Sequence, residues 1–244
     1  MRRTNNNGKD MPLQFSRRNL LRLAAIATLG AGGLSGYLAR ALAAARVPLH
    51  PGVHEIGGEV HINNQPARLG QLVRPGDVVV TGKKAKTVIV IGKDAFLLRA
   101  NTRFEVRGQP ERRDAHGVTQ EAVVEALRIV GGAVLSVFGR GRKRIETPFV
   151  TIGIRGTGVY VESDSERSYV CTCYGETEIA ALQDSAIRET VMTKHHESPR
   201  YITGGPTPRI EKAPVLNHTD AELDMLEVLV GRRTPFDPFG SGYY

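Results

Sequence analysis

The chain has 244 residues, with 33 Lys and Arg against 25 Asp and Glu, and a formal net charge of +8. Most of this excess lies in residues 1–43, which hold seven basic residues against Asp10 and leave the remainder at only +2. Residues 44–244 are thus nearly neutral and attract polyanions only weakly. Their one compact basic cluster, Arg140 with Arg142 to Arg144, is typical of a solvated turn. The charge therefore argues against nucleic acid as a partner. Trp is absent and aromatic residues are few, so the core must be built from Val, Ile, Leu and Ala.

The first 43 residues have the order of an export signal. Arg17-Arg18 precedes an uncharged run, Leu23 to Leu38, that several glycines dilute, and Ala41-Leu42-Ala43 supplies the small-x-small pattern that a signal peptidase cleaves. We expect a twin-arginine signal peptide over residues 1–43, cleaved between Ala43 and Ala44. The mature protein would then reach the periplasm without a stable transmembrane span. The alternative is an uncleaved signal that anchors the chain in the inner membrane.

Short apolar runs bounded by turn residues predict strands from residue 60 onward. A further strand, Leu127 to Val130, is expected to stop at Gly131-Gly132. Strands at this spacing predict an all-β sandwich or barrel. The predicted runs are Val60–Ile62, Val78–Val80, Val88–Ile91, Phe96–Leu98, Phe104–Val106, Ala133–Phe138 and Val159–Glu162.

An ordered series of residues between Val53 and Val161 resembles the FecR-type domain, named for the ferric-citrate regulator. The resemblance implies a periplasmic all-β module, a β-sandwich or jelly-roll-like domain over residues 44–165, that senses or relays a signal. Residues 1 to 15 are too few to form the helical anti-sigma segment of the family. The resemblance therefore implies only the fold and a binding or scaffolding role for this chain. The series is Gly58-Glu59-Val60, Pro66-Ala67, Gly70, Pro75-Gly76-Asp77, Thr81-Gly82, Asn101-Thr102, Leu127, Gly131-Gly132, Thr147-Pro148 and Arg155-Gly156-Thr157.

The last element of that series, Arg155-Gly156-Thr157, has two interpretations. It is either a structural turn, whose glycine permits a close approach of strands and whose arginine pairs with a carboxylate, or part of a ligand site.

A β extension over residues 166–212 carries both cysteines of the chain. Tyr169 to Gly175 predicts a strand that stops at Gly175, and the period of two places Cys171 and Cys173 on one face. Neighbours at this spacing lie near or beyond the reach of an unstrained disulfide. A hairpin could bring one imidazole of His195-His196 beside the thiols, a ligand set suited to Zn²⁺ or copper. A strained or intermolecular disulfide, or inert or redox-labile thiols, are the alternatives, and no cofactor is firmly predicted.

Residues 213–244 predict a helix and an aromatic tail. Thr219 and Glu222 have the spacing of a capping box, and Gly231 supplies a stop for the helix that follows. The apolar stripe of this helix predicts docking onto the β body. With the tail residues Phe236, Phe239, Tyr243 and Tyr244 it could instead bind an envelope protein.

The chain carries no motif of a hydrolase, phosphate loop or zinc protease, and we expect it to be non-enzymatic. The sequence thus predicts an exported FecR-like binding or regulatory module. A metal-binding or redox-sensing protein and a structural component of an envelope complex are the two alternatives, and the small ligand is unknown.

Overall fold

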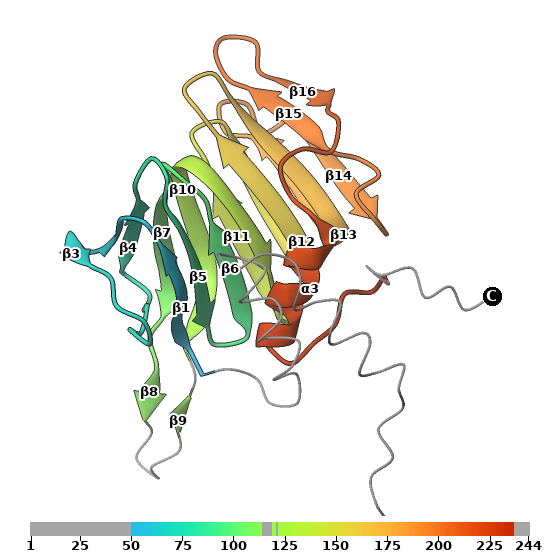
Figure 1. The fold of residues 1–244 in the computed structure, drawn as a ribbon. Helices are drawn as coiled ribbons and strands as arrows, with labels where there is room; N and C mark the ends of the chain where they lie inside the picture. The colour runs from blue at the N-terminus through green and yellow to red at the C-terminus, as the bar shows by residue number, and fades with distance from the viewer. Residues whose placement is uncertain (1–49, 114–118, 121, 237–244) are drawn as a thin grey trace, which may run out of the picture.

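A computed structural model describes residues 50–113, 119–120 and 122–236 (Figure 1). Arg17, Arg18, Ala43, Ala44 and the tail beyond Phe236 lie outside these ranges. Within the described part of the chain, no helix is long and apolar enough to cross a membrane.

The described residues form sixteen strands and one helix, α3 (Asp220–Leu229). The strands are β1 (Gly52–Gly57), β2 (Val60–Ile62), β3 (Gln65–Pro66), β4 (Val78–Thr81), β5 (Lys86–Ile91), β6 (Asp94–Leu98), β7 (Arg103–Gln109), β8 (Arg112–Arg113), β9 (Thr119–Gln120), β10 (Val123–Val137), β11 (Arg142–Glu146), β12 (Val150–Ser163), β13 (Arg167–Ala181), β14 (Arg188–Thr193), β15 (Arg200–Thr203) and β16 (Arg209–Lys212).

The long strand β10 is the branch point of the main sheet. Its first half pairs with β7, which leads to β4, β2 and β3, and its second half pairs with β6, which leads to β5 and β1. Beyond β10 the sheet continues through β11 and β12 to β13, which carries β14 on one stretch and β15 and β16 on another. Figure 1 shows the two arms on one side of the molecule and the β12 to β16 region on the other.

One apolar core fills the space between the two arms. Phe104 of β7 and Phe96 of β6 come from different arms, and their ring centroids lie 5.3 Å apart. Val79, Ile89 and Ile152 belong to the same buried cluster. The arms therefore pack face to face as in a β-sandwich.

A second core lies on the opposite face of β5, β6, β10, β12 and β13, beneath α3. Along β5 and β6 successive side chains alternate between the two cores: Phe96 joins the inner one, and Leu97 joins Leu223 and Leu226 under the helix. The Thr219 capping box is present, and Gly231, with φ 73°, follows the helix. The predicted all-β fold with one short C-terminal helix docked on the sheet is confirmed.

Two predicted strand ends are wrong. Gly131-Gly132 does not stop β10; a bulge absorbs it, and Gly132 adopts φ 89° with its backbone against Thr102. Gly175, with φ 88°, sits where β12 and β13 shift register, and β13 runs on to Ala181. Glycine at these positions permits close backbone approach without ending the strand. The domain boundary expected after residue 165 falls in the turn between β12 and β13, which pair along their length.

Candidate metal centre

Four potential metal ligands meet beneath α3. Cys171 and Cys173 come from β13, His196 from the loop after β14, and His218 from the segment that leads into the helix. One ligand atom from each residue lies within 4.8 Å of the others. The two cysteines are 0% exposed, His196 is 8% and His218 is 9% exposed, so the cluster lies inside the protein.

The strand β13 positions both sulfur atoms. Its pleat directs Tyr169, Cys171 and Cys173 to the second core, as the period of two predicts. Both cysteines are free thiols, and the Cys173 thiol lies 3.6 Å from the Cys171 carbonyl oxygen.

A tight turn after β14 sends His196 inward. Its φ of 59° is uncommon outside glycine, and its N–H donates to the Cys173 carbonyl at 3.0 Å. The Glu197 carboxylate accepts from the N–H groups of Lys194 and His195 and closes the turn. Backbone strain held by several partners in this way is a common feature of functional sites.

His218 is fixed from two sides. Its ring stacks on Tyr160 with centroids 4.5 Å apart, and its Nδ1 lies 2.6 Å from the Leu216 carbonyl oxygen. The capping box of α3 begins at the next residue, Thr219, so docking of the helix also places this imidazole.

The distances among the ligand atoms resemble the edges of a small tetrahedron. His196 Nδ1 lies 3.4 Å from Cys171 Sγ and 3.0 Å from His218 Nε2. The bond lengths of tetrahedral zinc give about 3.5 Å for such a sulfur–nitrogen edge and about 3.3 Å for a nitrogen–nitrogen edge. The two edges that meet at His196 Nδ1 are therefore close to those of a tetrahedral zinc site.

The outer nitrogens of both imidazoles have acceptors. His196 Nε2 lies 3.0 Å from Asp220 Oδ1, and His218 Nδ1 faces the Leu216 carbonyl. These partners are the kind that orient metal-bound histidines. They assign the protons to the outer nitrogens, so two lone pairs face each other inside the cluster. A shared proton or a cation must separate them.

The local electrostatics favour a thiolate. The neighbouring Cys173 is the largest influence that lowers the pKa of Cys171, to about 4, and the nearby His196 and His218 act in the same direction. Burial raises the pKa of Cys173. The thiolate is the form of cysteine that binds metals.

The structure separates the two adjacent histidines of the predicted set. His196 joins Cys171, while His195 places Nε2 at 2.8 Å from Asp220 Oδ2 and is exposed. Sequence reasoning missed His218 and Asp220. His218 follows His196 by 22 positions, and its one sequence signal was its place just before the capping box.

Arg155-Gly156-Thr157 forms a bulge in β12. Gly156 has φ 57°, and Arg155 lies 3.5 Å from Glu176 on the neighbouring strand. The Thr157 hydroxyl donates to the carbonyl oxygen of Tyr174. The pairing of Arg155 with a carboxylate agrees with the structural interpretation, while Gly156 also lines a pocket.

Comparisons with known proteins give a distant fold likeness. The chain matches no family model and no curated protein. Two crystal structures of a protein described as a candidate anti-sigma factor from Parabacteroides distasonis align with TM-scores of 0.41 and 0.43, at 11% and 10% identity. Each alignment covers 56% of this chain and 58% of the other. The chain thus spans just over half the length of these structures, and a likeness this remote carries no argument about function.

Proposed function

We propose that this protein is an exported, non-enzymatic module that binds one metal ion through Cys171, Cys173, His196 and His218. The observation that carries the proposal is the meeting of four ligand atoms within 4.8 Å of one another in the protein interior. Two sulfurs and two imidazole nitrogens are the set of many structural zinc sites, and the thiolates also suit Cu⁺.

The closed ligand set favours binding or regulation over catalysis. A catalytic zinc keeps a coordination position open for water or substrate, whereas here the protein supplies four ligands. The ligands also come from β13, the loop after β14 and the segment before α3. A bound ion would therefore hold the helix to the sheet, and its loss would release it.

A FecR-like scaffold and export through the twin-arginine signal complete the proposal. Two turns of the FecR-like series have a clear structural basis. Gly76, with φ 101°, lies in a turn closed by Asp77, whose carboxylate accepts from the Arg74 N–H. Thr102 accepts the N–H of Ala133 beside Gly131-Gly132. Transport of folded proteins suits a metal inserted before export, and the residues that support export are Arg17, Arg18, Ala43 and Ala44.

Native mass spectrometry of the mature protein, purified with Zn²⁺ present, tests the proposal. We expect one zinc ion per chain, and loss of that ion in Cys171→Ser and in His196→Asn. The matched control is His195→Asn, because this neighbouring imidazole binds Asp220 and does not belong to the set of Cys171, Cys173, His196 and His218. Bound copper in place of zinc would support the proposed metal site and would identify copper as its ion.

Metal-free wild-type protein after incubation with either ion would refute the proposal. So would equal metal content in His195→Asn and His196→Asn. Circular dichroism of each variant establishes that the fold survives the substitution.

A further inference from the structure

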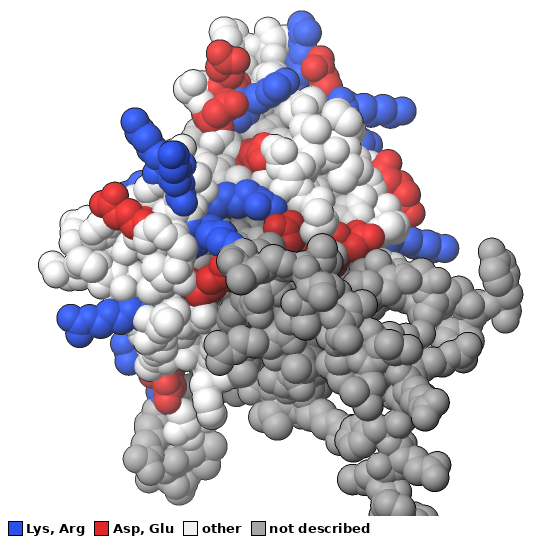
Figure 2. All heavy atoms as spheres, viewed as in Figure 1, with Lys and Arg blue, Asp and Glu red and all other residues white. Residues whose placement is uncertain are grey.

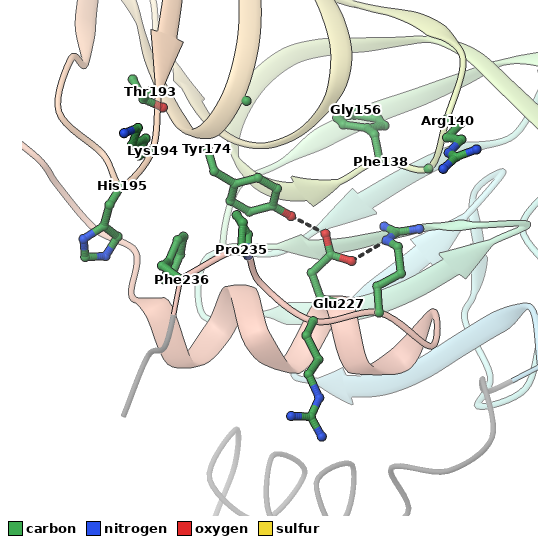
Figure 3. Close-up of a pocket in the computed structure, with 14 residues that line it drawn as sticks. Phe138, Arg140, Gly156, Tyr174, Thr193, Lys194, His195, Glu227, Pro235 and Phe236 are labelled. Atoms are coloured by element: carbon green, nitrogen blue, oxygen red, sulfur yellow. Dashed lines mark hydrogen bonds and ion pairs between the residues drawn. The ribbon is translucent and has the colours of Figure 1, made fainter. Parts of the chain in front are cut away.

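A pocket of about 590 Å³ lies beside the metal cluster and is separate from it. Its walls come from the loop after β10, the bulge of β12, the end of β14 and the segment after α3 (Figure 3). His195, which does not contact the thiols, lies at one end, and Arg140 lies at the other (Figure 3).

The lining of this pocket has an excess of positive charge. Its basic residues are Arg140, Lys194, Arg232 and Arg233. Glu227 is the one lining carboxylate among the described residues, and it is already engaged: Arg232 Nε lies 2.5 Å from its Oε2, and the Tyr174 hydroxyl donates to its Oε1. Arg140, Lys194 and Arg233 are exposed, and no ion pair joins any of them to another residue in the described ranges. Around this cavity, three cations thus have no ion-pair partner among the described residues.

Arg232 supplies a donor with no acceptor. Its Nε binds Glu227 and its Nη1 donates to the Lys93 carbonyl at 2.7 Å, while its Nη2 is buried and has no hydrogen-bond partner in the described structure. A buried unpaired donor is costly, and a ligand oxygen would satisfy it once the Arg232 guanidinium turned toward the cavity.

Aromatic rings form the rest of the wall. Tyr174 and Phe236 pack edge to face with centroids 5.9 Å apart, and His195 lies 4.4 Å from Phe236. Phe138 lines the same pocket. Apolar walls with a few convergent polar groups are the usual composition of a small-molecule site.

We propose that this pocket binds an organic carboxylate with an aromatic body. The carboxylate accepts from Arg140 and from Arg232 Nη2, whose guanidinium turns toward the cavity on binding, and the ring packs against Tyr174 and Phe236. This inference does not rest on the metal site.

Isothermal titration calorimetry of the mature, zinc-loaded protein with naphthalene-2-carboxylate tests the proposal. Naphthalene-2-carboxamide has the same aromatic body without the charge, and we expect it to bind at least about tenfold more weakly. Arg140→Gln should weaken carboxylate binding by about tenfold, the loss expected for one charge-assisted hydrogen bond. The matched control is Arg142→Gln, an exposed neighbour outside the pocket, which should bind as the wild type does.

Three results would overturn the proposal: no heat of binding with millimolar carboxylate, equal affinity for carboxylate and carboxamide, or an unchanged affinity in Arg140→Gln. The same titration on folded Cys171→Ser separates the two sites. Carboxylate binding that survives there stands whether or not the metal proposal does.

Discussion

At the scale of single residues, Gly132 was expected to end a strand. Its actual role is to let the backbone of β10 approach Thr102 closely. A Cβ atom at this position would lie 2.4 Å from both Cα and Oγ1 of Thr102, and the φ of 89° is unfavourable for any L side chain. We expect Gly132→Ala to lower the free energy of unfolding by about 2–4 kcal/mol, since overpacking and backbone strain add. Urea denaturation measures this loss.

The neighbouring glycine provides the control. At Gly131 the nearest atom to a new Cβ is the Ser163 carbonyl oxygen at 3.8 Å, an ordinary contact, and φ is not in the left-handed region. Gly131→Ala should therefore stay within about 0.5 kcal/mol of wild type. Equal destabilisation by both substitutions would show that the bulge is not the cause.

The candidate site was only partly predictable for a related reason. The alternation along a strand placed Cys171 and Cys173 on one face, and the turn signal after Lys194 brought one histidine to them. No local pattern assigns His218 to the cluster, because its position depends on how α3 docks. Strand periodicity was enough to predict that Cys171 and Cys173 share a face. The position of His218 depends on tertiary packing and could not be predicted from the sequence.

At the scale of elements, one ion pair joins β14 to β15 around the loop that carries His196. Arg200 of β15 donates through Nε to Glu189 of β14 at 2.8 Å, and this hydrogen bond is the main cause that lowers the pKa of Glu189 below its ordinary 4.5. A carboxylate with a lowered pKa stabilises the fold above its unfolded pKa, and that contribution disappears as the pH falls through the folded pKa.

We therefore expect Glu189→Gln to be less stable than wild type at pH 7. Because the Glu189 side chain is 37% exposed, solvent screening keeps the effect modest. The difference should shrink as the pH falls below 4.5, as thermal denaturation at a series of pH values would show. The control is Glu178→Gln, whose ion pair with Arg188 is exposed and 3.9 Å long and whose stability at pH 7 should stay close to that of the wild type. A difference that persists at low pH would exclude the charge as its source.

Predicted elements matched the structure where the apolar runs were short and bounded by turns. The strands at 60–62, 78–81 and 94–98 and the capped helix agree with their expected positions. The long strands β10, β12 and β13 were expected as fragments, because their internal glycines resemble stops. Only pairing with neighbours shows that these glycines are bulges.

At the scale of the whole molecule, the proposed ion would add a further link between α3, the loop after β14 and the sheet, which hydrogen bonds, ion pairs and packing already hold together. Chelation of zinc from the wild-type protein should lower its melting temperature, since a ligand at 1,000 times its Kd contributes about 4 kcal/mol to stability. Hydrogen exchange should rise in α3 and in residues 194–197. It should stay unchanged in β2, β4 and β7, which lie in the arm away from the cluster.

Hydrogen exchange measured by mass spectrometry before and after chelation gives this map. A uniform rise across all strands would contradict a local role for the ion, and no change would remove its structural role. On the visible face of the molecule, acidic and basic side chains are interspersed (Figure 2), so bulk charge is not expected to mask these local effects.

The burial of β5 and β6 on both faces limits which amino-acid substitutions these two strands tolerate. On β7 the exposed and buried positions alternate, so every second residue can change with little cost. From Val88 to Ile91 in β5 and from Ala95 to Leu98 in β6, one side chain joins the inner core and the next joins the second core, and all of these side chains are buried. A polar replacement at consecutive positions would be left without a partner in either core. Variation among descendants of this chain should therefore accumulate in the outer arm, while residues 88–91 and 95–98 remain apolar.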